Sequence, residues 1–351
     1  MIATGVSIQE VARRAGVSAS TVSRALSGKA AVRPETKRRV LQAVRELDYR
    51  PNVLAKSLKE GKSRTIGLII PNIHHLVFPA AVRGVSDVAR KHGYTVVLCN
   101  TDEDLGTERA HVENLTGRLV DGLIFSTATQ ESTHLLSLKE RGYPIVLMIR
   151  YFSDELDTVM VDNFRGAYEA TRFLLARGYR EIALINGKLE LDLYRQRLAG
   201  YRAALAEGGL PAEDDLVVNA TVGWEDGYRA VQTIYERGRR PDAFFGTSDP
   251  KALGVLKALK DRGVRVPEDV AVMGYDNLEM AELSDPPLTT MAQPFYEVGR
   301  RAAERLIKLI ERKRRSKPAV ERLETRLLVR RSVGYGRGSA GDIRGESRAS
   351  P

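Results

Sequence analysis

Residues 7–26 read SIQEVARRAGVSASTVSRAL, and this stretch decides the fold of the N-terminal part of the chain. Ser7 and Glu10 have the spacing of a capping box, in which each residue closes the first helical turn on the other. The apolar residues that follow repeat at helical spacing. Gly16 can supply a turn of positive φ, and Ser18 is a natural N-cap. The stretch therefore predicts two short helices joined by a tight turn.

The second of these helices has one apolar and one polar side. Val22, Ala25 and Leu26 can pack back on the first helix. The side chains then predicted to face outward are Ala19, Ser20, Thr21, Ser23 and Arg24. Small polar groups and one Arg on such a helix fit a helix inserted into the major groove of DNA. A plain helical hairpin with a solvated face would show the same short pattern.

Charge separates this head from the rest of the chain. Residues 1–64 carry 14 Lys and Arg against 5 Asp and Glu, and residues 311–351 carry 12 against 5. The intervening residues 65–310 carry 29 against 35. A basic head on an acidic body is expected of a protein that binds nucleic acid through the head and a small ligand through the body.

The remaining composition restricts the class of protein. The single cysteine, Cys99, excludes an intrachain disulfide, and its apolar run YTVVLC predicts a buried thiol. No apolar stretch approaches the roughly 20 residues that span a bilayer. The N-terminus lacks the hydrophobic region of a signal peptide. We therefore expect a cytoplasmic protein.

Strand and helix patterns alternate after the head. Short apolar runs predict strands at 65–70, 94–99, 122–126, 144–149, 181–186, 243–247 and 270–275. Helical stretches lie between most of them, which predicts parallel sheets covered by helices on both faces. The length of the chain predicts a small head and a body of two α/β lobes. In such sheets, ligands bind at the carboxyl ends of the strands.

Three further segments lie outside this alternation. Residues 33–36, RPET, begin a third head helix with Pro34 at its first position, and its predicted apolar stripe comprises Val40, Leu41, Val44 and Leu47. Residues 49–58, YRPNVLAKSL, predict a short helical segment with too few apolar residues to fold alone. Residues 335–351 are rich in Gly, Ser and Arg and are predicted to be disordered.

The chain resembles the LacI/GalR family of bacterial transcriptional regulators. The similar segments, in the same order over residues 6–333, are VSIQEVARRAGVSASTVSRALSG, VRPETKRRVLQAVRELDYRPNVLAKSL, TIGLIIPNI, VDGLIFS, VDNFRGAYEATRFLLARGYREIALING, RLAGYRAAL, DVAVMGYDN and PPLTTMAQP. The resemblance implies a homodimeric repressor, with no enzymatic activity, cofactor or metal. It would bind palindromic operator DNA under the control of a small-molecule effector similar to a sugar.

The resemblance also implies a division of the chain. A helix–turn–helix domain would occupy residues 1–50, a hinge helix and linker 51–63, and a body like periplasmic binding proteins 64–334. Lobe 1 would comprise about 64–150 and 290–318, and lobe 2 about 162–285 and 322–334. The chain would then cross between the lobes near residues 150–162, 284–290 and 317–323.

Residues for DNA binding follow from the same resemblance. Ala19 and Ser20 match positions that select the operator sequence, and Arg24 can reach a guanine edge. Phosphate or flanking contacts are assigned to Ser7, Ser18, Thr21, Ser23, Arg33 and Tyr49, although Thr21 and Ser23 would also suit a merely solvated face. The hinge positions that match a minor-groove helix are Asn52, Ala55 and Leu58. Leu58 matches a wedge that kinks the duplex, or alternatively packs under the body.

An effector cleft between the lobes is implied in the same way. Arg197 and Asp276 match residues that bind polar groups of the effector, and Trp224 matches a stacking aromatic. The other matching positions are Phe78, Ser126, Arg150, Asp162, Ser248, Asp249 and Phe295. These residue types suit the hydroxyls and the C–H face of a sugar, and a basic purine-like ligand could use the same set. Phe78 and Phe295 could equally belong to the core.

The sequence departs from the family around this predicted cleft. HHLV at 74–77, Ile149 and Ser248 stand where the family commonly has other residues. The two histidines do not predict a metal site, because no third ligand has suitable spacing.

Two other functions fit parts of the sequence. A solute-binding protein for transport would share the body fold but would carry a signal peptide and no basic head. An α/β enzyme would carry a phosphate loop, a dinucleotide-binding glycine motif or a nucleophile elbow, and the sequence contains none of these.

Overall fold

The structure is a computed structural model that describes residues 6–27, 32–49, 62–117, 120–219, 223–311 and 317–334. It divides into two compact units at Ser63 and Arg64, a head and a body. The predicted hinge residues Asn52, Ala55 and Leu58 and the predicted tail at 335–351 lie outside the described residues.

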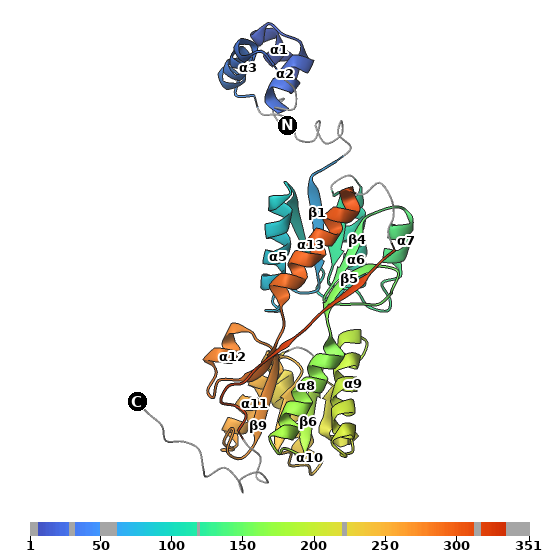
Figure 1. Ribbon diagram of the computed structural model, residues 1–351, viewed down its shortest axis with the longest axis vertical. Helices are drawn as coiled ribbons and strands as arrows, with labels where there is room; N and C mark the ends of the chain where they lie inside the picture. The colour runs from blue at the N-terminus through green and yellow to red at the C-terminus, as the bar shows by residue number, and fades with distance from the viewer. Residues whose placement is uncertain are drawn as a thin grey trace, which may run out of the picture. The chain divides into compact units, whose positions relative to one another are not determined.

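Three helices form the head (Figure 1). They are α1 (Ile8–Ala15), α2 (Ala19–Ser27) and α3 (Pro34–Glu46). The backbone N of Glu10 donates to Ser7 Oγ over 3.3 Å, and the backbone N of Ser7 donates to Glu10 Oε2 over 2.7 Å. Gly16 ends α1 with φ at 64°. The capping box, the glycine turn and the helix–turn–helix are therefore confirmed.

The head core forms around the fully buried Val11, Val22 and Val40. Two predictions about this core are wrong. Ala19, predicted to face outward, packs partly against the core, because it begins α2 directly beside the turn. Leu41, predicted to lie on the buried stripe of α3, is 39% exposed. Successive helical residues point about 100° apart, and it is the adjacent Val40 that points inward.

Lobe 1 of the body is a parallel six-stranded sheet (Figure 1). Its strands in spatial order are β11 (Val320–Leu323), β5 (Asp157–Val161), β4 (Ile145–Met148), β3 (Gly122–Phe125), β1 (Thr65–Ile70) and β2 (Thr95–Asn100). One face packs on α5 (Phe78–Lys91) and α13 (Phe295–Glu311), and the other packs on α6 (Leu105–Thr116) and α7 (His134–Glu140). Burial on both faces explains the continuous apolar runs of the central strands.

Edge strand β2 departs from this pattern. Cys99 is buried, as predicted, but Val97 and Leu98 are exposed. An edge strand has a neighbour on one side only, so the run YTVVLC is not buried along its whole length.

Lobe 2 repeats the arrangement with a second six-stranded sheet. Its strands in spatial order are β12 (Arg326–Leu328), β10 (Thr289–Ala292), β9 (Ala271–Asp276), β8 (Ala243–Gly246), β6 (Ile182–Asn186) and β7 (Val217–Asn219). Only β12 is antiparallel to its neighbour among these described strands. The helices are α8 (Asn163–Ala176) and α9 (Asp192–Glu207) on one face, and α10 (Trp224–Glu236), α11 (Asp249–Asp261) and α12 (Glu279–Leu283) on the other; a short η1 (Asp214–Leu216) precedes β7. The predicted fold class is therefore confirmed.

Three crossings connect the lobes. The first, at Asp162 between β5 and α8, lies at the end of the predicted range. The second was predicted at 284–290 and this is wrong, because residues 289–292 form β10, which pairs with β9 in lobe 2. The chain crosses after it, at Gln293 and Pro294. The third was predicted at 317–323 and this is also wrong, because residues 320–323 form β11, which pairs with β5 in lobe 1. The chain crosses after it, at residues 324–325.

Pairs of helices within a lobe approach to backbone contact. A side chain at Gly299 of α13 would overlap the carbonyl oxygen of Ala81 in α5. In lobe 2, a side chain at Gly227 of α10 would overlap the carbonyl oxygen of Lys251 in α11, and Gly254 of α11 meets α10 in the same way. These pairs leave no room for sliding without a change of packing.

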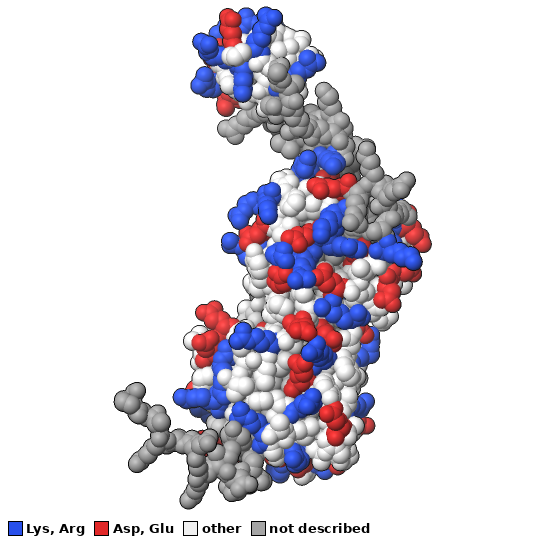
Figure 2. Space-filling model, viewed as in Figure 1, with Lys and Arg blue, Asp and Glu red and all other residues white. Residues whose placement is uncertain are grey.

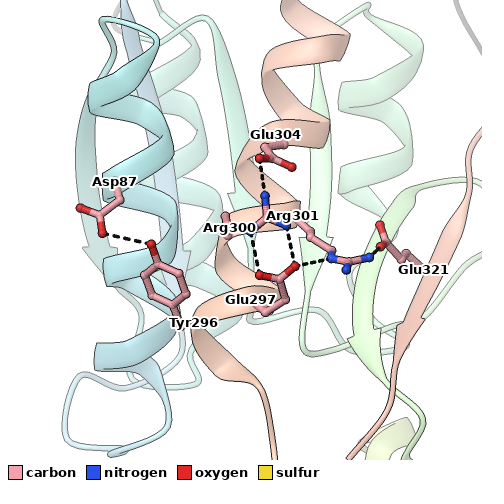
Figure 3. A network of polar contacts seen from close by, with 7 residues as sticks. All are labelled: Asp87, Tyr296, Glu297, Arg300, Arg301, Glu304 and Glu321. Atoms are coloured by element: carbon pink, nitrogen blue, oxygen red, sulfur yellow. Dashed lines mark hydrogen bonds and ion pairs between the residues drawn. The ribbon is translucent and has the colours of Figure 1, made fainter.

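A row of charges ties α13 to strand β11 (Figure 3). Glu297 accepts hydrogen bonds from Arg300 over 2.5 Å and from Arg301 over 2.6 Å. These bonds lower the pKa of Glu297 to about 2. Arg301 also pairs with Glu321 of β11. The helix is thus bonded to the strand that leads into the third crossing.

Candidate functional site

The outward side of α2 carries predicted base contacts. Ser20 and Arg24 are exposed there, while Thr21 and Ser23 are half-buried. Ser18 Oγ accepts from the backbone N of Thr21 over 3.2 Å and lies 2.8 Å from Ser20 Oγ. The start of α2 therefore presents a cluster of short hydroxyl side chains followed by one guanidinium.

The residues predicted to contact phosphates or flanking groups of DNA differ in exposure and in existing hydrogen bonds. Arg33 is exposed, whereas Tyr49 is half-buried against the head core. The Ser7 hydroxyl is occupied in the capping box. Figure 2 shows Lys and Arg prevailing over Asp and Glu on the visible face of the head, while both signs mix over the body.

In lobe 2, polar groups gather where parallel strands end. Strand β6 ends at Asn186, β9 ends at Asp276, and Thr247 and Ser248 follow β8. All four residues are buried. Carboxyl ends of neighbouring parallel strands share one edge of a sheet, which is where α/β folds bind ligands. We call this edge, with Arg197 and Lys251 added below, the lobe 2 wall.

Arg197 projects from α9 into the lobe 2 wall. Its Nε donates to Asn163 Oδ1 over 3.0 Å, and its Nη1 donates to the carbonyl oxygen of Thr247. Its Cζ lies 4.0 Å from the centre of the Tyr275 ring, a distance at which the ring attracts a cation. The predicted effector-binding Arg is thus buried and held in one orientation.

Two carboxyl groups predicted for the cleft have different surroundings. Asp276 has φ at 124°, an unusual backbone conformation, and its Oδ1 accepts from Gln293 Nε2 over 2.6 Å. Asp249 accepts from Thr290 Oγ1 over 2.6 Å and from the backbone N of Leu278 over 2.7 Å. Both oxygens of Asp249 are therefore bonded within lobe 2. Burial raises the pKa of both carboxyls, and Arg197 opposes the rise at Asp276.

Lobe 1 contributes the facing wall, where Arg150 follows β4. Its two terminal nitrogens donate to Glu103 over 2.6 and 2.8 Å, and Nη1 also donates to the Thr127 carbonyl over 3.2 Å. The nearby Ser126 hydroxyl donates to the Met148 carbonyl over 3.0 Å and is thereby occupied inside the lobe. We call Arg150, Glu103, Ser126 and Thr127 the lobe 1 wall.

Four other residues predicted for the cleft lie in the core of lobe 1, at the first crossing or at an exposed helix start. Phe78 and Phe295 are core side chains of lobe 1, which supports the alternative interpretation of both. Asp162 lies at the first crossing and caps α8 by accepting from the backbone N of Arg165 over 2.9 Å. Trp224 begins α10 and is 50% exposed.

One tyrosine of α9 lies beside the cations of lobe 2. The centre of the Tyr194 ring is 5.5 Å from Arg197 Cζ and 4.5 Å from Lys251 Nζ. Burial raises the pKa of Tyr194, and the charges of Arg150 and Glu103 in the lobe 1 wall also act on that pKa. Tyr194 is therefore a residue of lobe 2 that is exposed to the charges of both walls.

Sequence reasoning missed several members of these walls. Lys251 is fully buried beside Tyr194, and Glu103, Asn163 and Gln293 bond to predicted site residues. Asn163 and Gln293 each lie next to or within a crossing, a position that could have marked them. No local pattern marks Glu103 or Lys251.

Two structural findings concern metals and membranes. In the described ranges, no three or more His, Cys, Asp or Glu side chains are grouped to hold a metal ion. Within the same ranges, no helix has the length and apolar character needed to cross a membrane.

Two family models match this chain. Residues 7–52 match the bacterial regulatory proteins of the lacI family, and residues 63–330 match the periplasmic binding proteins and sugar binding domain of the LacI family. The chain belongs to the LacI family of bacterial regulatory proteins. It is accordingly a DNA-binding transcriptional regulator, and the earlier resemblance is confirmed.

Individual LacI-family relatives match over almost the whole chain. Catabolite control protein A of Priestia megaterium is 35% identical over 309 residues, which cover 88% of this chain and 93% of that protein. The transcriptional regulator CelR–cellobiose complex is 32% identical with a TM-score of 0.73, and covers 93% of this chain and 99% of that one. The Lac repressor dimer bound to operator and the anti-inducer ONPF is 26% identical with a TM-score of 0.85, covering 94% and 100%. These relatives are regulators and not enzymes.

Proposed function

We propose that this LacI-family regulator is a homodimeric repressor whose affinity for palindromic operator DNA changes when a sugar-like effector binds between lobes 1 and 2. The exposed hydroxyl and guanidinium groups at the start of α2 carry the proposal, because they belong to a basic head attached to a ligand-binding body. A regulator of DNA would act in the cytoplasm and would need no cofactor.

DNA recognition would begin with α2 in the major groove. Ser20 can make one hydroxyl bond to a base edge, and Arg24 can bond guanine with two nitrogens. Ala19 is half-buried and would offer at most a methyl contact. Other contacts, to phosphates or flanking groups, are proposed for Ser7, Ser18, Thr21, Ser23, Arg33 and Tyr49. In the hinge, Asn52 and Ala55 would follow the minor groove, and Leu58 would act as a wedge.

A second copy of the chain would associate through the body. Val97 and Leu98 lie on edge strand β2 and are 37% and 39% exposed, and Ile73 and Leu76 nearby are 55% and 47% exposed. An exposed apolar edge strand favours pairing with another chain. Val97→Asp should therefore convert dimers to monomers in sedimentation, whereas Val329→Asp, at another exposed apolar position, should leave them intact.

The effector would occupy the space around Tyr194. Arg197 and Asp276 would bind its polar groups, with Arg150, Ser248 and Trp224 as further contacts. A ligand that contacts both walls would favour one separation of the lobes over another. Such a shift would change the position of lobe 1 relative to lobe 2 at the three crossings. It would then affect the head through the linker that joins the head to lobe 1.

Selection from random duplexes with the full chain tests the proposal. We expect one near-palindromic sequence, bound with an affinity that falls steeply with salt because basic groups displace counterions. Arg24→Ala should weaken that binding by about 1–3 kcal/mol and relax the sequence preference. Arg141→Ala, which removes an exposed Arg of lobe 1, is the matched control and should change neither. Absence of any selected sequence would contradict the proposal.

A further inference from the structure

Lys251 is an unusual component of the lobe 2 wall. It lies in the first turn of α11, its side chain is fully buried, and its Nζ has no hydrogen-bond partner within the described residues. Nζ lies 4.5 Å from the centre of the Tyr194 ring. Burying an ammonium group without a hydrogen-bonding partner is unfavourable, so a ligand that supplies one would gain from it.

The charge of Lys251 acts on groups of both lobes. Its ring partner Tyr194 is the residue whose pKa responds to charges of both walls. In lobe 1, His75 has a pKa lowered mainly by burial and additionally by nearby cations that include Lys251. The backbone of Lys251 is meanwhile fixed from behind, because its carbonyl oxygen packs against Gly227 of α10. The Lys251 ammonium is thereby placed beside Tyr194, and its charge also interacts with Asp276 and with Asp226 at the start of α10.

The carboxylates around Lys251 are engaged elsewhere. Asp226 pairs with Arg229 at 2.6 Å, and Asp249 has both oxygens bonded inside lobe 2. Asp276 accepts from Gln293 and also lies near Arg197. Two cations, Arg197 and Lys251, thus share this wall, and both lie over aromatic rings.

Neutral groups with spare hydrogen-bonding capacity surround these cations. In lobe 2, Ser248 Oγ and Asn186 Oδ1 are buried and have no partner within the described ranges. Thr127 Oγ1 of lobe 1 is in the same state. A ligand with several hydroxyls could satisfy all three, since buried polar atoms in proteins are normally bonded.

We infer that the effector is an acidic sugar derivative whose carboxylate or phosphate is bound by Lys251 and Arg197 in lobe 2. The inference rests on the proposed function, because it places the effector between the lobes. Lys251 acts as a point charge for the anion, and Nη2 of Arg197, for which the described part of the chain supplies no hydrogen-bond partner, can add a hydrogen bond. The hydroxyls of the sugar then bond to Ser248, Asn186 and Thr127.

Calorimetry with matched neutral and acidic sugars tests the inference. The probes are glucose and galactose, their uronic acids, gluconate, and their 6-phosphates, which separate carboxylate from phosphate recognition. We expect one acid to bind the full chain about tenfold or more tighter than its neutral parent. Lys251→Met should abolish that preference, since Met fills a similar volume without charge. Lys260→Met removes an exposed Lys from the same helix and should retain the preference.

The outcomes separate this inference from the proposed function. Equal affinity for acids and parents, an unchanged preference in Lys251→Met, or the binding of no acidic probe would each overturn the inference. Thermal melting shows whether Lys251→Met is folded, and Lys251→Arg, which keeps a cation, should retain part of the preference. Selection of operator DNA is measured separately. If an operator sequence is selected but no acidic sugar binds more tightly than its neutral parent, the proposed regulatory function is supported and only the proposed effector class is wrong.

Discussion

The two walls of the interlobe site hold their cations in different ways. In lobe 1, Arg150 lies against the carboxylate of Glu103, with both contacts under 3 Å at 2.6 and 2.8 Å. In lobe 2, Arg197 and Lys251 lie over the rings of Tyr275 and Tyr194. A carboxylate cancels a cation, whereas a ring attracts it and leaves its charge available. Asp276 lies near both cations of lobe 2, but its Oδ1 accepts from Gln293, so we infer that more positive charge is available to a ligand in lobe 2 than in lobe 1.

The strongest test of this difference removes one Arg from each wall. Arg197→Met should lower the affinity for an acidic sugar about a hundredfold or more, because its replacement cannot reproduce charged hydrogen bonds. The double variant Arg150→Met/Glu103→Gln, which removes the ion pair as a unit, should lower it much less, because in the parent protein Glu103 already neutralises that Arg. Calorimetry compares the two proteins. Equal losses would show that both walls carry the anion.

Lys251 can be tested without any ligand. Lys251→Met should raise the free energy of unfolding by about 1–3 kcal/mol, because it removes a buried unpaired donor. Burial lowers the pKa of Lys251 to about 7. The unfolded chain therefore holds this proton more tightly, and the stability of the parent rises with pH above about 7 and up to about 10.4.

The gain from Lys251→Met should accordingly be larger at pH 6 than at pH 9. Urea denaturation at the two pH values measures it, with Lys260→Met as the exposed control. A loss of stability at both values would mean that the Lys251 ammonium has a stabilising partner and that the two walls are more alike than we infer.

Removing the countercharge in lobe 1 should make the walls more similar. Glu103→Gln keeps the shape of the side chain but leaves Arg150 with its charge unpaired. We expect affinity for acidic sugars to rise about threefold to tenfold through the added attraction. Affinity for the neutral parent sugars serves as the control and should change little. A fall for acids would indicate that Glu103 holds Arg150 in position for the ligand.

The smallest effect is expected at the paired cations of α13, outside both walls. Hydrogen bonds from Arg300 and Arg301 lower the pKa of Glu297 to about 2. Their stabilisation is complete above the ordinary Glu pKa and is lost as pH falls through about 2. Glu297→Gln should cost about 0.2–1 kcal/mol at pH 7 and nothing near pH 2. Acid denaturation curves of the two proteins should converge; parallel curves would contradict this role.

Local chemistry made the head predictable from the sequence. Ser7, Glu10 and Gly16 interact with residues three or four positions away, so their spacing is enough to identify the turn. Strand β10 was missed, because only its pairing with β9 and β12 distinguishes Thr289–Ala292 from a loop between prolines.

Residues of the candidate site could be predicted from the sequence only where they match a position in a family motif. Arg197 and Asp276 were predicted and lie together in lobe 2, although their roles stay predictions. Glu103 lies 47 residues from Arg150 in the sequence, so their pairing follows from the tertiary fold. Lys251 is an ordinary choice for the first turn of an exposed helix, and its burial beside Tyr194 follows from the tertiary fold.

The glycines between paired helices have a mechanical consequence. Helices in backbone contact, as at Gly299 in lobe 1 and Gly227 in lobe 2, form layers of low compliance. A ligand bound to one wall would then deform the interior of a lobe very little. It would instead rotate the lobes against each other about the crossings at Asp162, Gln293 and Thr325. The stiffness of each lobe therefore sets how much of the binding energy can reach the head.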